Sequence, residues 1–270
     1  MQLRLWHEDC HLDSRMSTDR PDRAINKERE MKWMLGVMLA LGLGGCSKLD
    51  YTKVSGDGAV IEQRHPLGQQ VTRVLAGVPA NIHLVAGAAS GIHIRGQGNL
   101  LPYLELTEKG DKLEIEVKEG YRLEPPEPID ITITLPKVEE LALAGLARGD
   151  LSGFSGDELV LSVAGTGDIV ASGLVLNRLE GNIAGSGILD LGEGSAREVE
   201  LNIAGAGGVS GAQFKGEEVE VNIAGSGDVA VNASELLKVG IAGSGSVSYL
   251  GNPRLESEIA GSGAISRAGS

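Results

Sequence analysis

Hydrophobic and polar residues alternate with a period of two along most of the chain after residue 58. In the segment before residue 204, Val199, Leu201 and Ile203 fall on one side of a predicted strand, and Glu200 and Asn202 fall on the other. Successive side chains of a strand point to opposite faces, so this alternation indicates strands with one buried side. The pattern therefore predicts an all-β protein.

A short motif, an aliphatic residue followed by Ala-Gly-small-Gly, recurs at nearly constant spacing. It reads VAGTG at 163–167, IAGSG at 183–187, IAGAG at 203–207, and IAGSG at 223–227, 241–245 and 259–263, after a degenerate LAGLA at 143–147. The intervals are 20, 20, 20, 20, 18 and 18 residues. Because fixed periods of this size mark repeat architectures, we expect each interval to form one structural unit.

Each motif separates two short predicted strands, and its first glycine lies at the corner between them. Glycine tolerates a positive φ and close backbone approach, as a sharp corner requires. One 20-residue unit buries too few aliphatic side chains to fold alone, so the units must stack. A propeller blade would need about 40–50 residues. We therefore expect a parallel β-helix with coils of 18–20 residues and corners at Gly165, Gly185, Gly205, Gly225, Gly243 and Gly261. That the helix is right-handed is expected from the fold class and not from these residues.

The chain divides into five segments by composition and pattern. Residues 141–270 contain the solenoid repeats, and residues 58–140 are β-rich without a visible repeat, so we expect them to continue or cap the solenoid. Residues 31–45 have a lysine, an apolar run and two glycines, which is typical of a signal peptide. Residues 46–57 read as a tether. Residues 1–30 are polar and non-periodic, and we interpret them as an upstream extension before the start at Met31; the alternative is a long n-region of the signal peptide.

The sequence Leu43-Gly44-Gly45-Cys46 resembles the lipobox of bacterial lipoproteins. The resemblance implies cleavage before Cys46 and lipidation of its thiol. Stable anchoring needs more than one acyl chain, in agreement with acylation of the new N-terminus as well. Ser47 stands where lipoproteins that stay in the inner membrane often have an aspartate. The sequence therefore resembles that of a lipoprotein sorted to the outer membrane, on its cell-surface or its periplasmic face.

The chain is also similar to the family described as putative auto-transporter adhesin, head GIN domain. The stretches that carry the similarity are VLAGVPANIHLVAG (74–87), IHIRGQGNLLPYLEL (92–106), KLEIEV (112–117), IDITITLPKVEELALAG (129–145) and the IAGSG motifs, and together they span about residues 60–268. The family implies a right-handed β-helix on exported, often lipid-anchored proteins, and it supplies no catalytic residues.

Charge and cysteine content narrow the classes of function. The first 45 residues carry equal numbers of acidic and basic side chains, so the net charge of −13 belongs to residues 46–270. Such an acidic surface disfavours nucleic acid as a partner. Cys46 is the one cysteine after residue 45, which leaves no intrachain disulfide in that part.

The sequence contains neither a Walker A motif nor a Gly-x-Ser-x-Gly motif. His83 and His93 lie on predicted strands without zinc-ligand spacing, and we expect them to face solvent. A polysaccharide lyase would need clustered acids, but in the expected stack Asp168 and Asp228 are separated by Ile188 and Gly208. We therefore expect neither an enzyme nor a bound cofactor.

One column of outward residues needs explanation. Glu180, Glu200 and Glu220 should lie on successive coils, about 4.8 Å apart, where like charges repel. A parallel column of Asn182, Asn202 and Asn222 could be joined by amide hydrogen bonds, but the repeat offers no such reason for the glutamates. The column is either a solvated negative face or a Ca²⁺ site.

These observations predict an exported, lipid-anchored envelope protein that acts as a non-catalytic surface adhesion or interaction module. Its partners would be the membrane, through Cys46, and an extracellular or envelope protein or glycan. Two alternatives stay open. The first is a structural or stress-related lipoprotein that faces the periplasm and has no external ligand, and the second is a glycan-active β-helix enzyme.

Overall fold

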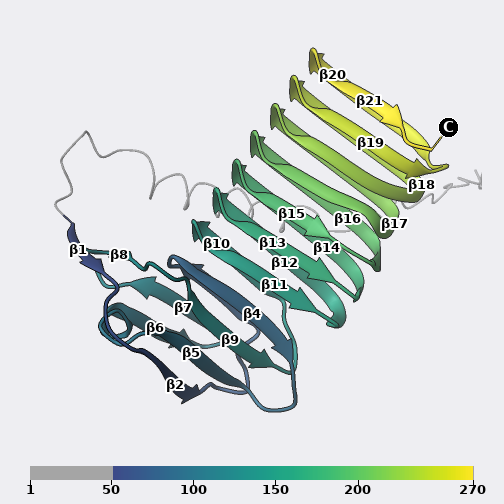
Figure 1. Cartoon of the computed structure of the whole chain (residues 1–270). Helices are drawn as coiled ribbons and strands as arrows, with labels where there is room; N and C mark the ends of the chain where they lie inside the picture. The colour runs from purple at the N-terminus through teal and green to yellow at the C-terminus, as the bar shows by residue number, and fades with distance from the viewer. Residues whose placement is uncertain (1–50, 270) are drawn as a thin grey trace, which may run out of the picture. The chain divides into compact units, whose positions relative to one another are not determined.

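A computed structural model describes residues 51–269, nearly all of them in strands and turns (Figure 1). The strands of the first half are β1 Thr52–Ser55, β2 Val60–Pro66, β3 Arg73–Gly77, β4 Ala80–Ala86, β5 Gly91–Gln97, β6 Leu104–Lys109, β7 Lys112–Val117, β8 Tyr121–Glu124 and β9 Ile129–Leu135, with a 3₁₀ turn at Leu101–Tyr103. The strands of the second half are β10 Glu140–Gly145, β11 Arg148–Ser152, β12 Ser155–Gly165, β13 Asp168–Ser172, β14 Leu174–Gly185, β15 Ile188–Leu191, β16 Gly194–Gly205, β17 Gly208–Gly225, β18 Asp228–Gly243, β19 Ser246–Gly251, β20 Arg254–Gly261 and β21 Ala264–Arg267.

The second half is a parallel β-helix, which confirms the fold class expected from the repeat. Strands of successive coils pair in parallel, β10 with β12, β12 with β14, β14 with β16, and so on to β20 (Figure 1). The corner residues Gly165, Gly185 and Gly205 lie in register at 20-residue intervals. From Gly225 to Gly243 and on to Gly261 the interval is 18 residues.

The alternating pattern in the sequence places one side of every coil in a continuous core. Val199, Leu201 and Ile203 are each no more than 5% exposed. The same inward positions of the neighbouring coils hold aliphatic residues that stack directly on them, such as Leu179 and Ile183 below and Val219 and Ile223 above. Each coil is thus stabilised by packing against the coils on either side, as in other solenoids.

The first half both continues the solenoid and closes its end. Strands β3 and β4 pair in parallel with β10 and β11, and on their other side with β7 and β9. Beyond them the direction changes: β5 runs antiparallel to β9, β2 antiparallel to β5, and β6 antiparallel to β7. The core runs on into this half through buried residues such as Ile82, Leu113 and Ile131.

A partly buried ion pair joins the first half to the solenoid. The side chain of Arg73 on β3 donates from Nε to Oε2 of Glu140 on β10 over 2.6 Å, and Glu140 is only 6% exposed. Beside it, the Thr72 hydroxyl donates to the Glu139 carboxylate at 2.8 Å, and the Glu139 backbone N–H donates to the Thr72 carbonyl at 2.7 Å. A buried charge is tolerated only when it is paired in this way.

Part of the segment interpreted as a tether has regular structure. Thr52–Ser55 form strand β1, which pairs in parallel with β8. The backbone of Tyr121–Glu124 provides the hydrogen-bonding partners of this strand, and Lys53 forms an ion pair with Glu124 at 3.0 Å. The alternation in residues 52–55 is too short to reveal a strand without knowledge of its partner.

Candidate functional site

The outward side of β12, β14, β16 and β17 presents two parallel columns of polar side chains, which we call the ladder face. It consists of Glu180, Glu200 and Glu220, of Asn182, Asn202 and Asn222, and of the flanking Glu158, Arg178 and Glu198. Strand register places the three glutamates side by side on successive coils, and the three asparagines likewise. The structure therefore brings together the residues that the sequence singled out.

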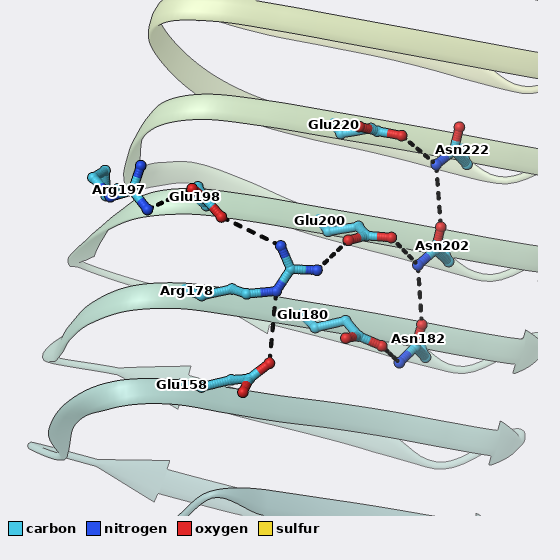
Figure 2. Close-up of polar contacts among 10 residues, drawn as sticks. All are labelled: Glu158, Arg178, Glu180, Asn182, Arg197, Glu198, Glu200, Asn202, Glu220 and Asn222. Carbon is cyan, nitrogen blue, oxygen red and sulfur yellow. Dashed lines mark hydrogen bonds and ion pairs between the residues drawn. The ribbon is translucent and has the colours of Figure 1, made fainter. Parts of the chain in front are cut away.

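The asparagines form a hydrogen-bonded ladder along the solenoid axis (Figure 2). Asn202 donates from Nδ2 to Oδ1 of Asn182 over 3.2 Å, and Asn222 donates to Asn202 over the same distance. Each amide also donates to a glutamate two residues earlier on its own strand, with Asn182 bonding Glu180 at 2.6 Å. The amide column thus holds the carboxylate column beside it.

Arg178 lies among the glutamates and neutralises part of their charge (Figure 2). Its guanidinium lies 3.6 Å from Glu158 and 3.4 Å from Glu198, and it also pairs with Glu200. Burial acts to lower the pKa of Arg178, but the attraction and hydrogen bond of Glu200, with the further charges of Glu180 and Glu158, raise it above its usual value. Arg178 is therefore always charged in this setting.

These contacts correct one expectation from the sequence. The glutamate column does have a structural explanation, because its members accept hydrogen bonds from asparagines and Glu200 is paired with Arg178. The signal that could have revealed it is a third column in the repeat, in which Arg178 stands between Glu158 and Glu198 at 20-residue steps. Strand register alone, however, does not say how far an arginine reaches along its neighbours.

The Ca²⁺ alternative for the ladder face stays a prediction. Within residues 51–269, no group of three or more His, Cys, Asp or Glu side chains is arranged so that it could hold a metal ion. Glu220, the outermost glutamate, accepts a hydrogen bond from Asn222 at 3.3 Å, and its neighbour on the next coil is Lys238. A hard divalent ion prefers several converging oxygen ligands.

The first glycine of each motif makes the corner of its coil. Gly165, Gly185, Gly205, Gly225, Gly243 and Gly261 have φ between 125° and 137°. A Cβ atom at Gly205 would lie 2.3 Å from the carbonyl oxygen of Gly185 on the preceding coil. No side chain fits there, so the glycines have a structural reason at every coil and need no phosphate or other ligand to explain them.

His83 and His93, two histidines of the first half, pair with carboxylates, and His83 also lies 3.9 Å through Nε2 from Oδ1 of Asp130. His83 on β4 contacts Asp150 on β11 through Nδ1, and His93 on β5 lies 3.1 Å through Nε2 from Glu62 on β2. Both rings lie on the outward side of their strands and are about one third exposed, as expected from the sequence. They form ordinary cross-strand polar pairs.

The acids of the short strands stand apart from one another. Asp168 and Asp228 are separated by Ile188 and Gly208 in the same column. A hollow of about 430 Å³ lies over this side of the coils, and among the described residues that line it Asp228 is the one ionisable group. The Ser246 hydroxyl donates to that carboxylate. This hollow gathers no acid and base pair of the kind that glycan cleavage requires.

The predicted signal peptide and the predicted lipidation site, Cys46, lie outside the described residues. Across the part of the chain that the structure describes, no helix is long and apolar enough to cross a membrane.

The geometry defines a class of protein: a parallel β-helix whose outer face displays regular columns of polar side chains on a rigid stack. The family model described as putative auto-transporter adhesin, head GIN domain, matches residues 72–253, and the chain belongs to this family. The family match confirms the resemblance seen in the sequence. The description, an adhesin head domain, points to a protein of the cell surface or envelope rather than an enzyme.

Solved structures share the fold. A putative adhesin from Bacteroides fragilis is 21% identical with a TM-score of 0.74, covering 79% of this chain and 99% of its own. A putative adhesin from Parabacteroides distasonis is 19% identical with a TM-score of 0.65, covering 80% of this chain and 100% of its own. A putative lipid binding protein from the same species is 22% identical with a TM-score of 0.67, covering 81% of this chain and 100% of its own. At these identities the likeness establishes the fold alone. No curated protein is similar enough to count as a match.

Proposed function

We propose that the protein is exported, cleaved before Cys46, lipidated on that cysteine and held at the outer membrane. There its β-helix acts as a non-catalytic adhesion or interaction module. The signal-like segment 31–45 and the Leu43-Gly44-Gly45-Cys46 sequence support export and anchoring. The adhesin family supports the role at the surface.

The observation that carries the interaction role is the ladder face. Its amides and carboxylates are fixed relative to one another by hydrogen bonds from coil to coil, so the free lone pairs of Glu220 and the edge amide of Asn222 project from a rigid surface. A preorganised surface loses little conformational entropy when it binds a partner. Solenoids commonly use extended faces of this kind for recognition.

The chemistry of this face suits a partner that is basic or rich in hydrogen-bond donors. Glu217, Glu218 and Glu220 lie near one another on β17, whereas the glutamates that Arg178 pairs with are Glu158, Glu198 and Glu200. Complementary charge speeds association and selects partners. An extracellular or envelope protein with a basic patch, or a glycan with free hydroxyl groups, meets this description.

An adhesion assay tests the role. Cells that lack the gene are complemented with wild type, with Glu220→Ala/Asn222→Ala, or with Lys53→Ala, an exposed control on β1 far from the ladder face in sequence and register. We expect the double variant, produced at the same level, to bind host or neighbouring cells several-fold less than wild type and the control. Equal binding by all complemented strains and by the deletion strain would instead favour the structural, periplasm-facing lipoprotein.

A further inference from the structure

Among the residues that the structure describes, nothing covers the outer side of the coil formed by β20 and β21. Within residues 51–269, β20 pairs only with β18, and β21 pairs only with β19 (Figure 1). All eight residues of β20 are exposed. Leu255 and Ile259 point toward the core yet are 41% and 43% exposed, whereas Leu237 and Ile241, their counterparts one coil earlier, are at most 3% exposed. The end thus offers both apolar side chains and unpaired backbone groups.

The opposite end of the molecule is protected against pairing. Its outer strands include β2 and β6. Strand β2 runs antiparallel to β5, carries Glu62 and Arg64, and ends at Pro66, and β6 runs antiparallel to β7 and carries Glu105, Glu108 and Lys109. Charged residues and proline on an edge strand discourage the addition of another strand. A head-to-tail fibre would need both ends to be receptive, so an association that uses one end twice fits the chain better.

We propose that β20 pairs with β20 of a second copy, antiparallel and about a two-fold axis, so that two solenoids join tail to tail. In antiparallel pairs, directly opposite residues point to the same side. With the axis at Glu256, Arg254 of each copy faces Glu258 of the other. This register makes the edge self-complementary, because it creates two pairs of opposite charge.

The same register also accounts for the remaining side chains of β20. The two Glu256 residues face each other, and each is already paired with Arg254 of its own chain at 2.8 Å, which offsets their repulsion. Leu255 lies diagonally opposite Leu255 and Ile259 of the second copy, within the reach of apolar side chains. Moving the axis to Ser257 would instead place Glu256 against Glu258 twice, and like charges in this position are destabilising.

Charge reversal tests the pairing. Sedimentation equilibrium of the full chain in mild detergent and reducing buffer should show a monomer–dimer equilibrium. Arg254→Glu and Glu258→Arg should each raise the dissociation constant about tenfold or more, and the double reversal should restore dimerisation. Arg64→Glu, on the outward-facing edge of β2, is the matched control and should leave the dimer unchanged. Thermal melting of each variant verifies that it is folded.

A monomeric wild type at about 100 µM would overturn the proposal, as would a dimer that both single reversals leave intact or that the double reversal fails to restore. A monomer would mean that another part of the chain covers the end.

An engineered cross-link tests the register independently of charge. Opposite Cα atoms in an antiparallel pair are about 4.5–5.5 Å apart, within the span of a disulfide. Glu256→Cys, with Cys10 and Cys46 changed to serine, should form a covalent dimer on oxidation, and a chain that stays uncrosslinked would contradict the two-fold axis.

Discussion

Arg178 and Glu200 form an ion pair between neighbouring coils although strand register does not place them opposite each other. Register pairs Arg178 with Glu198, and the guanidinium extends diagonally to Glu200, two residues farther along β16. Both side chains are about three quarters shielded from solvent. This ion pair offsets the repulsion among the glutamates of the column, which then helps to hold neighbouring coils together.

Removing the charge of Glu200 should therefore destabilise the protein. Glu200→Gln removes the charge of one of the three glutamates that pair with Arg178, and we expect a loss of about 1 kcal/mol, or roughly 2–4 °C in melting temperature. Glu220→Gln is the matched control, since no arginine within residues 51–269 pairs with Glu220, and it should change the melting temperature little. The difference should shrink at high salt. A stabilised Glu200→Gln variant would show that repulsion within the column dominates.

A Ca²⁺ site on the same face would give a different result. Wild type would gain thermal stability in millimolar Ca²⁺ through binding linkage, and Glu200→Gln would gain much less. Because Arg178 and the asparagines occupy the inner carboxylates, we expect the two proteins to shift equally, and no more than in Mg²⁺ or NaCl of matched ionic strength. A Ca²⁺-specific shift confined to wild type would assign an ion to the ladder face.

The asparagine ladder should be more sensitive at its centre than at its end. Asn202→Ala breaks the hydrogen bonds to Asn182 and from Asn222, and we expect a loss of about 1–2 kcal/mol. Asn222→Ala breaks only one ladder bond and should cost about half as much. Thermal melting followed by circular dichroism compares them, and equal losses would indicate that each amide acts only through its own strand.

The corner glycines should show the linear character of the stack. A side chain at Gly205 or Gly261 meets the preceding coil's carbonyl oxygen at 2.3 or 2.2 Å, so the local clash is the same. Gly205→Val should cost about 3 kcal/mol or more, because coils on both sides depend on that corner. Gly261→Val should cost less, because the last coil can separate alone. Gly77→Ala, where nothing lies within 4 Å, is the control. Equal melting losses at the two corners would contradict independent fraying of the end.

Acid should weaken the β6–β7 hairpin through Glu114. Hydrogen bonds from Lys112 and Lys109 lower the pKa of Glu114 below its ordinary value of 4.5. A carboxyl with a lowered pKa in the folded protein adds stability above its ordinary pKa, and this stability is lost as the pH falls through the lowered value. Between about pH 5 and pH 3 the melting temperature of wild type should therefore fall more steeply than that of Glu114→Gln. Parallel curves would show that solvent screens the pair completely.

The repeat in the sequence accounts for the solenoid because glycine corners and aliphatic columns are local and periodic. The 20- and 18-residue intervals alone align Gly165 with Gly185 and Gly225 with Gly243. The arrangement of the first half is a different matter. Nothing local indicates that β2 runs antiparallel to β5, or that Thr52–Ser55 pair with β8, since these contacts join segments far apart in the sequence.

The candidate site likewise has one part that the sequence predicts and another that it does not. The glutamate and asparagine columns follow from the period, and Asn202 could be expected to bond Asn182. The role of Arg178 could not be derived, because a long side chain can reach either the opposite residue or its diagonal neighbours. The exposed positions of Leu255 and Ile259 likewise depend on which coil is last in the stack.

Exposure of the anchored protein on intact cells tests the central claim most directly. Intact cells that produce wild type or Cys46→Ser are treated with a protease that does not cross the outer membrane, and the membrane and soluble fractions are then probed for the chain. The account predicts that wild type is membrane-bound and removed by the protease, whereas Cys46→Ser loses its hold on the outer membrane. A wild-type protein protected from the protease, or a Cys46→Ser variant that stays on the membrane like wild type, would contradict it.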